Sequence, residues 1–141
     1  MTQEKELAVA AIDKKADLIC DAADHIWEYA ELSLMEDRSA EYYCGVLEKE
    51  GFQVEKGICG IRTAFSASFG SGRPVIGILA EYDALSGLSQ EGGSLEQKEI
   101  TPGGCGHGCG HNLLGAGAFG AALGVKGKLE KTGKEGSVVL Y

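Results

Sequence analysis

The feature that most constrains the fold is a run of six apolar residues at positions 75–80, followed directly by Glu81-Tyr82-Asp83. A strand with one wet face alternates apolar and polar residues, whereas this run is apolar on both faces. We therefore predict a central strand with both faces covered. The patterns on either side alternate between helix and strand, which favours the α/β class.

The other elements are predicted from periodicity. Apolar residues recur at steps of three and four from Ile12 to Ala30, which predicts one long helix whose second, acidic stripe faces solvent. A shorter helix is expected at residues 39–50 before Gly51, and a helix rich in small residues at 112–130. Strands are expected at residues 52–54, 65–69, 75–80 and 137–141, with a hairpin turn at 70–73. The expected fold is a mixed central sheet flanked by helices, an incomplete three-layer sandwich.

Charge and composition exclude several classes of partner. The chain has 21 acidic and 13 basic residues and a net charge of −8, which repels nucleic-acid phosphates and anionic lipid. No apolar stretch is long enough to span a bilayer, and the first residues lack a signal-peptide pattern, so we expect a cytoplasmic protein. Its five cysteines are then expected to be free thiols or ligands.

The densest chemical signal is the segment Cys105-Gly106-His107-Gly108-Cys109-Gly110-His111. Thiolates and imidazoles bind zinc-like ions, and glycine lets the backbone approach an ion closely. In an extended segment residues two apart point the same way, so Cys109 and His111 can reach one ion together. The alternatives are a glycine-rich turn with buried thiols and a redox pair of Cys105 and Cys109, although three residues separate these two rather than two. The lone helical His25 is expected to be structural or solvated.

Two further patterns are less specific. Glu81 and Asp83 follow the apolar strand, where ligands bind in open α/β sheets, and a carboxylate there can orient a metal-bound histidine. A plain strand-to-turn transition explains them equally well. Residues 115–120 match the dinucleotide-binding glycine pattern, but no strand precedes them. We expect Gly117, Ala121 and Gly124 to let a helix pack close to the sheet instead.

Residues 81–90 and 107–115 together resemble the aminoacylase/carboxypeptidase family of metallohydrolases, and the resemblance extends from the first helix to the last residue. It implies a catalytic domain with a sheet between helices, an inserted dimerisation domain, and one or two zinc or manganese ions. It also implies a small-molecule substrate, because such ions activate water to cleave N-acyl amino acids or dipeptides. Cys109 and His111 match metal ligands, and Asp83 matches a carboxylate that orients the catalytic site. Glu81 and His107 are expected to support these groups.

One motif of the family is absent from these 141 residues. The family has a pair of glutamates, a general base and a metal ligand, after the strand that here ends at Tyr141. We therefore expect residues 1–141 to be the N-terminal part of the catalytic domain, without the dimerisation domain. Alone it should hold metal weakly and be inactive, whereas the full-length family forms homodimers or hetero-oligomers. The alternative is a small stand-alone metal-binding or thiol module without hydrolase activity.

Overall fold

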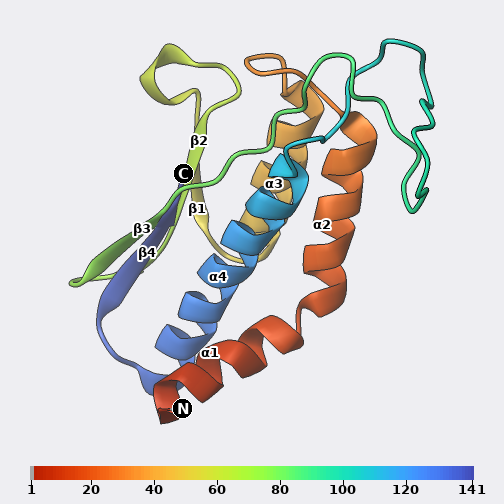
Figure 1. Cartoon of the computed structure of the whole chain (residues 1–141). Helices are drawn as coiled ribbons and strands as arrows, with labels where there is room; N and C mark the ends of the chain where they lie inside the picture. Colours follow the sequence, from red (N-terminus) through yellow and green to blue (C-terminus); the bar gives the residue numbers. More distant parts are fainter. Residues whose placement is uncertain (1) are drawn as a thin grey trace.

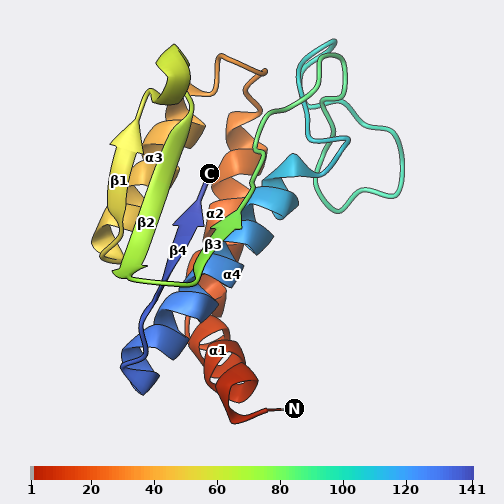
Figure 2. The ribbon, with the colours of Figure 1, turned by 90° about the vertical axis from the view of Figure 1, so that its left-hand side faces the viewer.

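The computed structural model describes residues 2–141 as a four-stranded sheet packed against α-helices (Figure 1). The elements in chain order are α1 (Gln3–Asp13), α2 (Ala16–Tyr29), α3 (Asp37–Lys49), β1 (Gln53–Lys56), the 3-10 helix η1 (Ile58–Gly60), β2 (Phe65–Ser71), β3 (Val75–Ile78), α4 (His111–Thr132) and β4 (Gly136–Leu140). The predicted class, a mixed sheet flanked by helices, is confirmed. The helices lie on one face of the sheet, and Figure 2 views the molecule from the other face. The described residues thus supply one of the two helical layers of the predicted sandwich.

The sheet has the strand order β1-β2-β4-β3. β2 is antiparallel to β1 and β4, whereas β3 is parallel to β4, with Ile76 opposite Val138. The parallel pair arises because α4 carries the chain from the end of β3 back to the start of β4. β4 therefore enters the sheet between β2 and β3. The predicted hairpin at residues 70–73 is wrong, because that turn joins two strands that are not neighbours.

The predicted central position of residues 75–80 is also wrong. β3 is an edge strand of the described sheet, and Val75 and Ile76 are 59% and 44% exposed. The inner strand is β4, whose Val138 and Leu140 are fully buried against the helices. An apolar pattern reports how apolar the two faces of a strand are. The order of neighbours in this sheet is set by the α4 crossover, which leaves no trace in the pattern of β3.

The single helix predicted from Ile12 onwards is two helices, α1 and α2, which meet at an angle (Figure 1). Lys15, between them, leaves the helical region with φ −113° and ψ 12°. The apolar stripe continues across the break because both helices pack on α4, where Ile12 contacts the position of Gly124 and Ile19 that of Gly120. The acidic stripe of α2 is exposed, as predicted.

Small residues of α4 allow α1, rather than the sheet, to approach closely. A Cβ atom at Gly127 would lie 2.4 Å from Cβ of Ala11 in α1. Gly117 and Ala121, which were predicted to face the sheet, are exposed. The glycine pattern at residues 115–120 lies inside α4, away from any strand-to-helix turn. None of the described helices is long and apolar enough to cross a membrane.

The hydrophobic core lies between the sheet and the helices α2, α3 and α4. Its large buried side chains are Ile26, Tyr43, Leu47, Phe52, Phe65, Phe119, Leu123, Val138 and Leu140. Because this core holds β4 against α4, it fixes the start of α4 beside the carboxyl ends of β3 and β4. The candidate site lies at that end of the sheet.

Candidate metal centre

The segment after β3 stays extended and is tied down on both sides. The Ala80 N–H donates to Tyr141 O at 2.8 Å, which continues the pairing with the end of β4. Further along, the Ala84 N–H donates to Glu31 O at 2.7 Å. Alternate side chains of an extended segment point to the same side. Glu81 and Asp83, which lie between these two hydrogen bonds, therefore present their carboxylates together.

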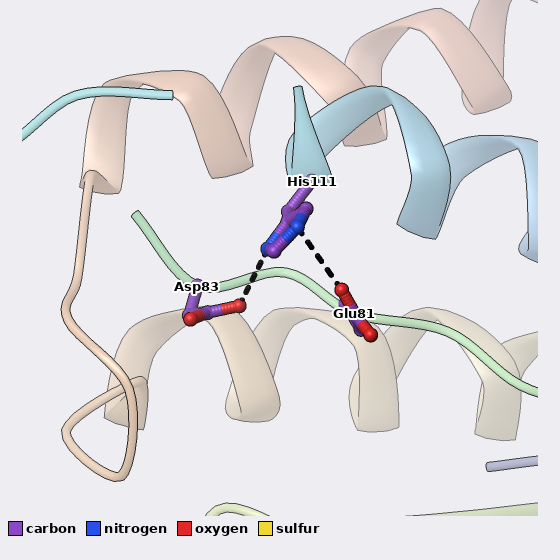
Figure 3. Close-up of side chains that lie close together, drawn as sticks. All are labelled: Glu81, Asp83 and His111. Atoms are coloured by element: carbon purple, nitrogen blue, oxygen red, sulfur yellow. Dashed lines mark hydrogen bonds and ion pairs between the residues drawn. The ribbon is translucent and has the colours of Figure 1, made fainter. Parts of the chain in front are cut away.

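Both carboxylates meet the imidazole of His111, the first residue of α4 (Figure 3). The Nδ1 atom of His111 lies 2.7 Å from Oδ1 of Asp83, and its Nε2 atom lies 3.0 Å from Oε2 of Glu81. One donor atom from each of the three residues falls within 4.8 Å of the others. The side chains of His111 and Asp83 are 17% and 23% exposed, whereas that of Glu81 is 61% exposed. The group is thus anchored inside and open to solvent on the Glu81 side.

The donor set of this group fits a divalent metal ion. One imidazole nitrogen and carboxylate oxygens are ligands that zinc and manganese both accept. A metal-bound histidine usually donates its other N–H to a carboxylate, which fixes the ring orientation. Asp83 is in place to accept that hydrogen bond from Nδ1 of His111. The Nε2 atom of His111 and the Glu81 carboxylate then remain as the groups that would hold the ion.

The long loop after Asp83 is folded back so that its two ends run side by side. Leu85 and Gly106 exchange two backbone hydrogen bonds of 2.9 and 3.0 Å, and the Ser89 N–H donates to Gly104 O at 3.0 Å. A Cβ atom at position 106 would lie 1.9 Å from Leu88 O, so only glycine allows this approach. The pairing places the segment that leads into His111 beside Asp83.

His107 does not join the group. It is 5% exposed, its Nε2–H donates to Ile26 O in α2 at 2.8 Å, and its ring stacks on Trp27 at 6.1 Å between centroids. Burial lowers the pKa of His107, so the ring stays neutral at neutral pH. The neighbouring Asn112 reaches the same helix through Ala23 O at 3.3 Å. His107 therefore supports the site by fastening the loop to α2.

Cys109 lies outside the group as well. The prediction that Cys109 and His111 point the same way assumed an extended segment, but the Gly110 N–H donates to His107 O at 3.0 Å and closes a turn. Cys109 sits in that turn and is exposed. All five cysteines are free thiols in the described chain, so Cys105 and Cys109 do not form the disulfide of a redox pair. Cys109 as a ligand stays a prediction from the family resemblance.

Two residues near the centre carry roles that the sequence did not reveal. The Glu31 carboxylate accepts hydrogen bonds from the N–H groups of Arg38 and Ser39, at 3.0 and 2.9 Å, and so caps the start of α3. Tyr82 points away from the centre, stacks on Phe65 and donates its hydroxyl to the backbone of the η1–β2 connection. Its place between two carboxylates in an extended segment was the available signal.

The comparisons with known proteins agree with the motifs. Within the family, the two motifs resemble those of the B subunit of aminobenzoyl-glutamate hydrolase. Over 131 residues, 93% of its length, the chain is 49% identical to the Escherichia coli K12 form of this B subunit, a p-aminobenzoyl-glutamate hydrolase. The predicted resemblance is confirmed. The chain spans 27% of the length of that relative, and no family model matches it.

Two solved structures share the fold. A putative aminohydrolase from methicillin-resistant Staphylococcus aureus superposes with a TM-score of 0.70 at 24% identity, over 99% of this chain and 34% of that one. A dinuclear metal-binding peptidase of the M20 family from Bacillus subtilis superposes with a TM-score of 0.68 at 24% identity, over 93% of this chain and 34% of that one. The described sheet and helices thus form the fold of about one third of each of these proteins.

Proposed function

We propose that this chain supplies one side of the metal centre of an amide hydrolase. The observation that carries the proposal is the placement of His111 between Asp83 and Glu81, in a chain 49% identical to part of a hydrolase subunit. The proposed ion is zinc or manganese, because the donor set combines imidazole and carboxylate. The proposed substrates are aminobenzoyl-glutamate, N-acyl amino acids or dipeptides, and the proposed setting is a cytoplasmic homodimer or hetero-oligomer.

Each residue has a separate role in this proposal. His111 binds the ion through Nε2, Asp83 holds the ring in the required tautomer, and Glu81 adds a carboxylate on the exposed side. The family resemblance makes Cys109 a further ligand. A bound divalent ion supplies a Lewis acid and lowers the pKa of its water. His107 keeps the loop against α2 and takes no part in the chemistry.

Metal uptake by the purified chain tests the proposal. Zinc and manganese affinity would be measured by calorimetric titration for the unsubstituted chain and for His111→Ala, Cys109→Ala and Cys105→Ala. We expect His111→Ala to lower the affinity by about 100-fold and Cys109→Ala to lower it measurably, whereas Cys105→Ala should have no effect. An equal loss for Cys105→Ala would point instead to a local cysteine and histidine site in a small metal-binding module.

Activity gives a second, independent reading. The 141 residues lack the glutamate pair that the family resemblance makes essential, so we expect them to hold the ion without turnover of aminobenzoyl-glutamate or dipeptides. Metal-dependent hydrolysis by these residues alone would contradict that expectation. The matched control is the same assay with the 49% identical Escherichia coli relative at full length.

A further inference from the structure

A second feature of the molecule is a cavity of about 320 Å³ beside the metal centre. Its walls come from the loop after α2, the segment around η1, and the residues that follow β3. Glu81 and Asp83 line it together with the apolar side chains of Leu34, Ile61 and Phe65. A cavity of roughly 150 Å³ accepts a benzene-sized ring, so this one has room for a ring with a short substituent.

The cavity contains a buried carboxylate without a partner. Glu36 lines it and is 7% exposed, and its Oε2 atom is fully buried with no hydrogen bond to any residue in the described chain. A buried charge that lacks a partner is strongly destabilising, so such groups are normally paired. The two arginines that follow in the sequence are engaged elsewhere, since Arg62 pairs with Asp37 and Arg38 lies over the ring of Tyr29.

Glu36 has no structural role that would account for its burial. It is the N-cap residue of α3, but its side chain makes no capping hydrogen bond. That role is taken by Glu31, whose carboxylate accepts from the backbone of Arg38 and Ser39. The loop before Glu36 also holds Leu34 at φ 66°, a conformation that leucine rarely adopts, with its side chain 63% exposed at the cavity. The carboxylate and the apolar rim are thus left over from folding.

We propose that this cavity is a binding subsite for a ring-sized apolar group that carries a primary amino group. The apolar part packs against Leu34, Ile61 and Phe65, and the amino N–H groups donate to the Glu36 carboxylate. Anionic groups are excluded because Glu36, Glu81 and Asp83 face the same space. This inference extends the proposed function, since a group held here belongs to an amide whose bond lies at the neighbouring metal centre.

Binding of small probes without metal separates this inference from the proposed function. The probes are benzamide, 4-aminobenzamide and 4-(aminomethyl)benzamide, which share a ring and differ in the amino group and its charge. Affinities would be measured by ligand-observed NMR with the full chain. We expect at least one of the amines to bind about tenfold more tightly than benzamide, because a hydrogen bond to a buried charge adds at least that factor. The neutral and the charged amine show which form is preferred.

Variants assign the preference to Glu36. Glu36→Gln should remove it, whereas Glu48→Gln, at an exposed position of the same helix, should leave it intact. In the unsubstituted chain the amines should shift the methyl resonances of Leu34 and Ile61, so the test holds even if Glu36→Gln fails to fold. Equal binding of benzamide and both amines, shifts elsewhere in the chain, or an unchanged preference in a folded Glu36→Gln variant would overturn the proposal. Metal uptake, measured separately, decides the proposed function.

Discussion

Two histidines four residues apart in one motif have opposite environments. His107 is buried against α2, with one ring nitrogen bonded to a backbone carbonyl and a neighbouring tryptophan on its face. His111 begins α4 and has a carboxylate oxygen within 3.0 Å of each ring nitrogen. The turn between them, closed by the Gly110 N–H, separates the two side chains. The motif therefore holds one structural and one metal-binding histidine, and the contacts of each ring decide which is which.

The largest effect expected from this comparison is on stability. His107→Ala should lower the free energy of unfolding by about 3 kcal/mol, because it removes a buried ring and leaves Ile26 O without that donor. His111→Ala should lower it by less than about 1 kcal/mol, since His111 lies at the open end of the sheet. Urea denaturation of both variants, with the partly exposed His25→Ala as a control, measures the difference. Equal losses for His107→Ala and His111→Ala would remove the distinction between them.

A smaller effect is expected at the carboxylate that orients His111. Asp83→Asn keeps the size of the side chain but removes the charge that holds the Nδ1–H of His111, so metal affinity should fall by about tenfold. Asp24→Asn, an exposed acidic residue of α2, provides the matched control and should leave the affinity unchanged. Calorimetric titration with zinc measures both. An unaltered affinity in Asp83→Asn would mean that Asp83 does not orient the histidine.

The smallest effect concerns pH. Burial lowers the pKa of His107 in the folded chain below its unfolded value of about 6.5. Between these two pKa values the unfolded chain binds more protons, so the free energy of unfolding falls as the pH drops below about 6.5. Above that pH the contribution of neutral His107 is complete. Comparison of unfolding at several pH values for the unsubstituted chain and His107→Gln should show that this part of the slope disappears in the variant.

The sequence predicted the helices and strands better than their arrangement. Local periodicity was sufficient for α3, β2 and α4, and the carboxylates after residue 80 were placed correctly at a strand end. The exchange of β3 and β4 was not predictable, because the crossover through α4 determines which strand enters the middle of the sheet. The break at Lys15 was hidden because Ile12 and Ile19 pack on the same helix.

The candidate site shows the same limit. His111 and Asp83 were predicted from residue type and motif, and the structure brings them together with Glu81. Cys109 was placed beside His111 by assuming an extended backbone, whereas the segment turns there and exposes its side chain. Glu36 gave no signal, because burial of a carboxylate depends on three segments that are far apart in the sequence. Residue types thus predict the chemistry, and the backbone path decides which groups meet.

The central claim is that His111, and not His107, binds the ion. The most direct test is imidazole ¹⁵N NMR of the chain during titration with zinc, in which His25, His107 and His111 are followed separately. The account predicts that the Nε2 resonance of His111 moves to the range of a metal-bound nitrogen while both nitrogens of His107 and His25 keep their shifts. Movement of His107 with His111 unchanged, or saturation with zinc without any change at His111, would contradict it.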